Sequence, residues 1–143
     1  MILLDTDHIT PLHYRSHANS QELDRRLKAA ADQHLSVSVV TVEEQMRGWL
    51  AAVHGAKKVH QQIPAYEWLA RLFEFYSAWE IAPFDERAAD NFERLRKQKI
   101  RIGTNDLKIA SIALVHDALL LSANLRDFRK VPGLRVECWL AVP

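Results

Sequence analysis

The chain has 143 residues, 48% of them hydrophobic, with 19 Lys and Arg against 18 Asp and Glu and a formal net charge of +1. A chain of this length buries roughly two thirds of its unfolded surface, so we expect residues 1–143 to form a single domain without disulfides or a structural metal. The four glycines are too scattered to form a glycine-rich nucleotide-binding loop. The single cysteine, Cys138, fits a reducing compartment. The near-zero net charge argues against a nucleic-acid partner.

Five short runs rich in Val, Ile and Leu have the length of β-strands. They lie at Ile2–Leu4, Leu35–Val40, Glu80–Pro83, Ala118–Leu121 and Leu134–Trp139. The first run is too short for a signal peptide or a membrane anchor, so we expect a cytoplasmic protein with no membrane association. Between the runs, apolar residues recur with a helical period. Apolar strands that alternate with helices predict a three-layer α/β/α domain with a mainly parallel sheet of about five strands.

Polar residues before helical segments predict where the helices begin. The expected starts are Ser20, Thr41, Asp85 and Thr104 or Asn105, and Pro64 should begin or kink a helix. The segment 55–79 is unusual because six of the twelve aromatic residues lie within fourteen positions, 66–79. Six aromatic side chains are more than a helix needs on the one face that packs against the core. Either a partner covers the second face of this helix, or the helix is a central element of the fold.

Carboxylates gather just after the apolar runs, where ligands bind in open α/β sheets. They are Asp5 and Asp7 after the first run, Glu43 and Glu44 after the second, Asp106 in the helix before the fourth, and Asp127 with Asn124 after the fourth. Clustered carboxylates repel one another, so such a group usually persists because it binds a cation. Oxygen ligands favour Mg²⁺ or Mn²⁺, and such ions can support phosphodiester hydrolysis.

Each acid also has a simpler explanation. Thr41 and Glu44 match a capping box, in which Glu44 bonds back to the Thr41 amide. Asp106 can interact favourably with the positive end of a helix dipole, Asp127 can belong to a turn, and Asp5 can cap the end of a strand. These explanations do not account for the convergence of all four acids on one edge of the sheet, which favours a metal-dependent nuclease.

Four stretches of the chain resemble the PIN-domain ribonucleases, and most closely the VapC-type toxins of bacterial toxin–antitoxin pairs. They are Leu-Leu-Asp-Thr-Asp at 3–7, Thr-Val-Glu-Glu-Gln-Met-Arg-Gly at 41–48, Ile-Gly-Thr-Asn-Asp-Leu-Lys-Ile-Ala at 102–110 and Ser-Ala-Asn-Leu-Arg-Asp-Phe-Arg-Lys-Val-Pro-Gly-Leu at 122–134. The resemblance spans nearly the whole chain. It departs from the family at Asp7, where many relatives carry Asn.

The resemblance implies a Mg²⁺- or Mn²⁺-dependent endoribonuclease that forms a homodimer and is inhibited by a cognate VapB-type antitoxin. The family's acids fall on Asp5, Glu44, Asp106 and Asp127, which would hold one or two ions. Thr6, Ser122 and Asn124 would orient these ligands. Asp7 would add charge beside the metal without removing a ligand.

A basic segment precedes Asp106. It contains five basic residues in eight and no acid: Arg94, Arg96, Lys97, Lys99 and Arg101. The rest of the chain then holds 14 basic and 18 acidic residues, so the small net charge conceals a separation of charge. We expect this segment, extended by Arg126, to bind the RNA backbone. The alternative is a solvated helix face that pairs with Glu86, Asp90 and Glu93.

The sequence gives weaker support to other functional hypotheses. His13 and His17 lie four residues apart, but no Glu follows His13 as an HExxH zinc site requires. Asp5-Thr6-Asp7 also resembles the signature of haloacid-dehalogenase-like phosphatases, with Asp5 as nucleophile, but this leaves Glu44 unexplained. A non-catalytic PIN scaffold that binds RNA or protein is a third hypothesis, and the presence of all four acids counts against it.

Overall fold

The structure is a computed structural model that describes residues 1–15 and 17–140. Within these residues, five parallel strands form one sheet in the order β3-β2-β1-β4-β5. Their bounds are β1 Ile2–Leu4, β2 Leu35–Ser38, β3 Glu80–Ala82, β4 Leu119–Leu121 and β5 Arg135–Glu137. All five runs that the apolar pattern indicated are strands, and the expected parallel α/β architecture is confirmed.

Helices connect every pair of consecutive strands. Strand β1 leads to α1 (Thr6–Tyr14) and α2 (His17–Ala29), and β2 leads to α3 (Val39–Gly55), the short 3-10 helix η1 (Val59–Gln62) and α4 (Ile63–Tyr76). Strand β3 leads to α5 (Glu86–Lys97) and α6 (Thr104–Val115), and β4 leads to α7 (Leu125–Phe128). Of the helices described, none has both the length and the apolar character needed to cross a membrane.

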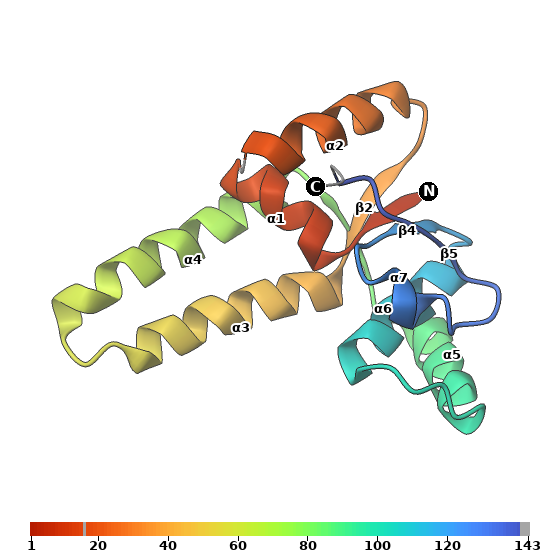
Figure 1. Ribbon diagram of the computed structural model, residues 1–143. Helices are drawn as coiled ribbons and strands as arrows, with labels where there is room; N and C mark the ends of the chain where they lie inside the picture. The colour runs from red at the N-terminus through yellow and green to blue at the C-terminus, as the bar shows by residue number, and fades with distance from the viewer. Residues whose placement is uncertain (16, 141–143) are drawn as a thin grey trace.

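The central strands bury both of their faces. Along β1, Ile2 and Leu4 pack with residues of α1, α2 and α4, whereas Leu3 packs on the opposite face with residues of α5, α6 and α7. This alternation follows from the two-residue period of a strand. Figure 1 shows the resulting layers, with α1 and α2 on one side of the sheet and α5 and α6 on the other.

The strand order reverses between β1 and β4. The chain adds β2 and β3 on one side of β1, then returns to place β4 and β5 on the other side. In open α/β sheets, such a reversal leaves a crevice at the carboxyl ends of the two central strands, because their connections leave in opposite directions. Here that position is occupied by Asp5 after β1 and Ser122 after β4.

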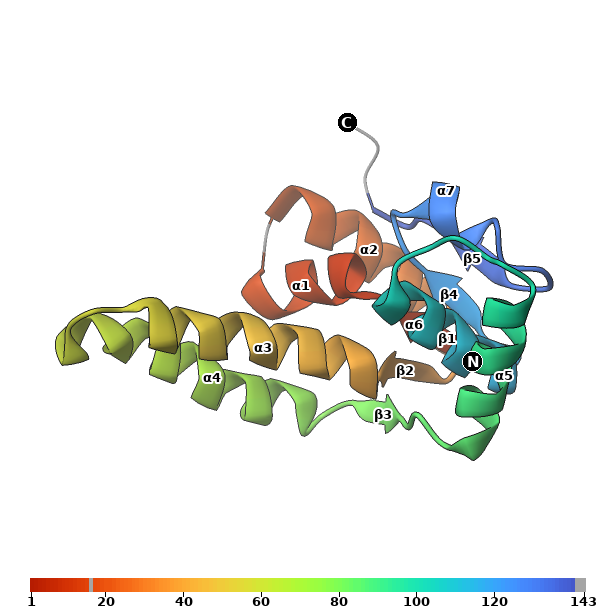
Figure 2. The ribbon, with the colours of Figure 1, turned by 90° about the horizontal axis from the view of Figure 1, so that it is seen from below.

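Helices α3 and α4 form an antiparallel pair that projects well beyond the sheet (Figure 2). Leu72 and Tyr76 of α4 are buried, but Tyr66 and Phe73 are 55% and 62% exposed. The aromatic-rich segment is therefore not a central element of the fold. One side of α4 packs within the chain, and the other presents apolar side chains to the surroundings.

The expected runs at 80–83, 118–121 and 134–139 are one to three residues longer than strands β3, β4 and β5. Two further expected boundaries, at the end of β2 and the start of α3, were wrong for one local reason. Strand β2 ends at Ser38 rather than Val40, and α3 begins at Val39. The Ser38 hydroxyl accepts a hydrogen bond from the Thr41 amide at 3.0 Å, so Ser38 and not Thr41 caps this helix.

The other expected helix starts met different outcomes. Asp85 caps α5 and Pro64 lies in the first turn of α4, both as predicted. Ser20 lies inside α2, so its prediction as a helix start was wrong. Helix α1 was not predicted, although Asp5 is its N-cap.

Candidate active site

The four acids that the sequence singled out lie on four different elements at the carboxyl edge of the sheet. Asp5 follows β1, Glu44 lies in the second turn of α3, Asp106 in the first turn of α6, and Asp127 in α7. Asp5, Glu44 and Asp106 are close enough for their charges to influence one another, and Asp127 acts on Asp106. Elements far apart in the sequence thus bring these carboxylates to one place.

Asp5 is the most buried of the four, with only 7% of its surface exposed. Its Oδ1 accepts a hydrogen bond from the backbone amide of Thr6 at 2.8 Å, and its Oδ2 accepts one from the Ser122 hydroxyl at 2.8 Å. The predicted contact of Ser122 with a carboxylate is present. The Thr6 hydroxyl, by contrast, makes no hydrogen bond with any described residue, so Thr6 holds Asp5 through its backbone.

Asn124 bridges the carboxylates of Asp106 and Asp127. Its side-chain amide donates to Oδ2 of Asp106 at 3.1 Å and to Oδ2 of Asp127 at 3.2 Å. The Asn124 backbone amide donates to the Ser122 hydroxyl at 3.1 Å, which links this pair to Asp5. A single loop after β4 therefore contacts three of the four acids.

Glu44 does not form the capping box that its spacing from Thr41 allowed. Ser38 already caps α3, and Thr41 is fully buried in the first turn. One oxygen of Glu44, Oε1, is buried without a hydrogen-bond partner among the described residues. A carboxylate oxygen is costly to bury in this way unless a cation or a proton accompanies it.

The electrostatics of the cluster agree with this geometry. Burial, followed by the charge of Asp7, raises the pKa of Asp5 to about 6. Burial, followed by the charges of Asp5 and Asp106, raises the pKa of Glu44 to about 7. Burial also raises the pKa of Asp106. Hydrogen bonds from Asn124 and then Lys130 instead lower the pKa of Asp127, so this acid stays ionised.

Asp7 is held by a network that the sequence did not reveal. Its Oδ2 accepts a hydrogen bond from the Ala123 amide at 2.9 Å, and its Oδ1 lies 2.5 Å from Nδ1 of the buried His8. The Nε2 of His8 accepts from the Trp139 amide at 3.0 Å, so the ring proton must be on Nδ1 and is donated to Asp7. Both oxygens of Asp7 are therefore occupied by protein donors.

The residues present fit a hard divalent cation. The donor set consists of carboxylate oxygens, one of them buried and unpartnered, and three of the four carboxyl groups have a raised pKa for which mutual repulsion is one cause. Over the described residues, no three acidic, histidine or cysteine side chains converge tightly enough to enclose an ion as they stand. The amide of Asn124 spans Asp106 and Asp127.

The five basic side chains of the segment 94–101 are exposed, and the segment ends next to this site at Arg101. In the part of the chain that the structure describes, none of these five side chains pairs with a carboxylate. The alternative expectation of a solvated helix face therefore holds for the exposure of these residues but not for their pairing with Glu86, Asp90 and Glu93. Lys130 connects the segment to the acids, because its ammonium donates to the Arg101 carbonyl and to Asp127, both at 3.3 Å. Arg126 is exposed on α7, beside Asp127.

The histidines whose side chains the structure describes do not form a metal site. The ring of His13 packs against Tyr14, Trp68 and Phe75, with its centroid 4.4 to 5.7 Å from theirs. Burial, followed by the charge of Arg71, lowers the pKa of His13 and favours its neutral form. The side chain of His17 lies outside the described residues.

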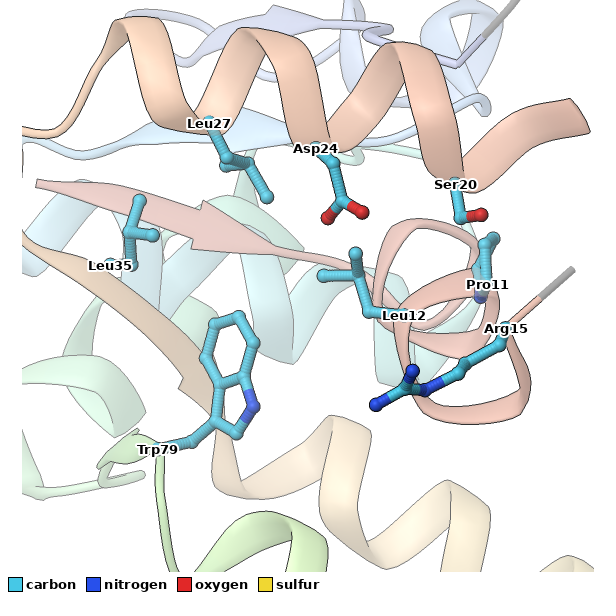
Figure 3. A pocket seen from close by; sticks show the side chains of 8 residues that line it. All are labelled: Pro11, Leu12, Arg15, Ser20, Asp24, Leu27, Leu35 and Trp79. Carbon is cyan, nitrogen blue, oxygen red and sulfur yellow. The ribbon is translucent and has the colours of Figure 1, made fainter. Parts of the chain in front are cut away.

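One cavity of the described chain lies away from the acids. It has a volume of about 530 Å³ and lies between α1, α2 and the amino end of β2 (Figure 3). Its lining is Pro11, Leu12, Arg15, Ser20, Asp24, Leu27, Leu35 and Trp79. Because ligands of open α/β sheets bind at the carboxyl ends of the strands, we assign the functional site to the acidic edge.

Comparison with known proteins agrees with this fold and this arrangement of acids. A family model described as "PIN domain" matches residues 2–134. The chain belongs to the PIN-domain family, and the resemblance noted in its sequence is confirmed.

The similar relatives within this family carry the name VapC. The protein called Ribonuclease VapC2 of Rickettsia felis is 30% identical over 131 residues, which cover 89% of this chain and 87% of that protein. Ribonuclease VapC1 of the same organism is 34% identical over 86 residues, which span 57% of this chain and 64% of that protein.

A solved structure is similar over the whole chain. The crystal structure of VapBC2 from Rickettsia felis bound to a DNA fragment from their promoter matches with a TM-score of 0.71 and 29% identity, and the match covers 97% of this chain and 99% of that one.

Proposed function

We propose that this protein is a metal-dependent endoribonuclease that hydrolyses RNA phosphodiester bonds and acts in the cytoplasm as the toxin of a VapBC-type pair. One observation carries the proposal. Asp5, Glu44 and Asp106 are held together at the strand-order reversal of a PIN-domain sheet, with each pKa raised by burial and by neighbouring carboxylates. Relatives named ribonuclease VapC support the choice of RNA as substrate.

Asp5, Glu44, Asp106 and Asp127 would hold one or two Mg²⁺ or Mn²⁺ ions, directly or through water. When bound, such an ion activates water for attack and neutralises charge that develops on the phosphate. The chain's own residues prepare the ligands. Ser122 fixes Asp5, and Asn124 keeps Asp106 and Asp127 together. Hydrogen bonds from Asn124 and then Lys130 keep Asp127 ionised.

The exposed basic segment positions the RNA. Arg94, Arg96, Lys97, Lys99 and Arg101 carry charge that no described carboxylate neutralises, and the Lys130 contact places the end of the segment beside Asp127. A phosphate backbone that follows this strip, extended by Arg126, would reach the acidic edge of the sheet. The separation of basic and acidic residues therefore serves binding and cleavage at one surface.

Partner proteins would cover the exposed apolar surface. The projecting α3–α4 pair and the neighbouring edge strand expose Val39, Leu50, Phe73 and Ile81 by 39 to 62%. We expect a homodimer, and a VapB-type antitoxin that blocks the active site, as the solved VapBC complexes suggest.

Cleavage of a mixed-sequence single-stranded RNA by the purified protein tests the proposal. We expect cleavage with Mg²⁺ or Mn²⁺, none in EDTA, and a loss of about 100-fold or more in kcat for Asp106→Asn. The matched control is Asp90→Asn, which removes the same charge from an exposed position on α5 and should leave activity unchanged. Persistence of cleavage in EDTA, or in Asp106→Asn at the control level, would contradict the proposal.

A further inference from the structure

A second cleft opens directly beside the acids, between α1 and α3. Its volume is about 440 Å³. Its lining is Thr6, Thr10, Tyr14, Glu44, Gln45, Gly48 and Trp49. Two of these residues, Thr6 and Glu44, belong to the acidic site, so the α1–α3 cleft and the candidate catalytic centre are continuous.

Two aromatic side chains of the cleft are held in place by the protein itself. The indole N–H of Trp49 donates to the Tyr14 hydroxyl at 2.9 Å. Trp68 stacks on Trp49 with ring centroids 5.7 Å apart and planes 10° apart, and it also contacts Tyr14 at 4.7 Å. Tyr14 and Trp49 are only half-buried, so the cleft offers preorganised aromatic surface beside the carboxylates.

Gly48 keeps the cleft open. It lies inside α3 with an ordinary helical backbone, where glycine costs about 1 kcal/mol relative to alanine. A Cβ added at Gly48 would meet no atom within 4 Å, so no packing constraint demands glycine there. The missing side chain leaves room in the cleft, one helical turn beyond Glu44.

Gln45 supplies a hydrogen-bond acceptor of fixed orientation. The Thr10 hydroxyl donates its only proton to the Thr6 carbonyl at 2.6 Å, so toward Gln45 it acts as an acceptor. The Gln45 side-chain N–H donates to Thr10 at 2.9 Å, which turns the Gln45 carbonyl oxygen away from Thr10. That oxygen accepts no hydrogen bond from any described residue.

We propose that the α1–α3 cleft binds one nucleobase of the RNA, adjacent to the phosphate that is cleaved. The base would pack against Tyr14 and Trp49, and the Gln45 carbonyl oxygen would accept a hydrogen bond from an amino or imino N–H on the edge of the base. This inference rests on the proposed ribonuclease function and adds a site that contributes to substrate selection.

The chemistry of the lining favours a base over an apolar side chain of a protein partner. An apolar group in the cleft would cover the Gln45 oxygen without offering it a donor, which is costly. A nucleobase has both an aromatic face and polar edges, and stacking on protein aromatics is a general mode of binding unpaired bases. Its attached phosphate would also lie toward Glu44, at the acidic end of the cleft.

The experiment uses a short single-stranded RNA whose cleavage site has been mapped. Each nucleotide next to the cleaved bond is replaced in turn by an abasic nucleotide, and kcat and KM are measured with Mg²⁺. We expect one abasic position to lower kcat/KM by about 10- to 100-fold, mainly through KM, because one stacked base is lost.

Variants at two glycines of α3 connect this effect to the cleft. Gly48→Leu fills the cleft and should abolish the difference between the normal and the abasic substrate. Gly55→Leu is the matched control, because a Cβ at Gly55 also meets no atom within 4 Å and Gly55 does not line the cleft. It should retain the full difference. If Gly48→Leu does not fold, Gln45→Met tests the cleft, and it should reduce the same difference.

The possible failures are distinguishable. RNA cleavage with no effect of an abasic nucleotide at any position overturns the base site and leaves the nuclease standing. An unchanged base effect in Gly48→Leu overturns the base site as well, and loss of antitoxin binding in that variant would then identify a protein occupant. Absence of cleavage of every RNA by the wild-type protein overturns the proposed function, and the base site with it.

Discussion

Replacement of Glu44 by glutamine should stabilise the metal-free protein while it impairs the site. The raised pKa of Glu44, about 7 against an ordinary value of 4.5, means that the folded state disfavours its ionised form. Glu44→Gln keeps the shape of the side chain, removes the charge, and breaks no hydrogen bond of the buried Oε1, which has no partner in the described chain.

The magnitude follows from linkage between proton binding and folding. A pKa raised from 4.5 to about 7 corresponds to about 3 kcal/mol for a fully buried group. Glu44 is only half-buried, so solvent screening reduces the expected gain to about 1–2 kcal/mol, or about 3–7 °C in Tm. Because the folded pKa lies above the unfolded one, wild-type stability falls as pH rises from about 4.5 to 7. The gain should therefore be present at pH 8 and nearly absent at pH 5.

Urea unfolding in EDTA at pH 5 and pH 8 measures this effect. The matched control is Glu43→Gln, since Glu43 is exposed and pairs with Arg47 at 2.9 Å, and it should change stability by less than about 0.5 kcal/mol. Added Mg²⁺ should stabilise the wild-type protein more than Glu44→Gln. A Glu44→Gln variant that is destabilised equally at both pH values would refute the assignment of Glu44 to a repelling carboxylate cluster.

Two further predictions concern the surface. The double variant Arg96→Gln and Lys99→Gln should weaken RNA binding and reduce the slope of log K against log salt by about 1.4, with kcat unchanged; an unchanged slope would remove these residues from the RNA contact. Phe73→Glu places a charge on the exposed apolar side of α4 and should shift the protein from dimer to monomer in light scattering, whereas Glu74→Gln on the same helix should not. A Phe73→Glu variant that stays dimeric would place the interface elsewhere.

Local chemistry explains what could be read from the chain alone. Apolar runs of three to six residues marked the five strands. The signal is strongest for central strands such as β1, which is buried on both faces and contains only apolar residues. Capping by Asp85 and the position of Pro64 depend only on neighbours in sequence, and both were predicted correctly. The four acids and the PIN-like motifs could also be identified without coordinates.

The contacts that assemble the site depend on tertiary structure. Ser122 reaches Asp5 across 117 positions of the chain, and the Trp139 amide reaches His8 across 131. Taken alone, the spacing of Thr41 and Glu44 favoured a capping box over a metal ligand, and only the capping of α3 by Ser38 excluded that box. The α1–α3 cleft had no sequence signal at all, because it arises where side chains from two helices face each other across a space left by Gly48.

The sequence by itself thus determined the five strands, their alternation with helices and the chemistry available at the sheet edge, since these depend on residue type and short-range spacing. Tertiary structure decided which carboxylates share one electrostatic environment, which basic side chains stay unpaired, and where the surface opens. The physical reason is that burial, repulsion and hydrogen bonding act between groups that are close in space, and packing of the sheet and its helices brings distant parts of the chain to that range.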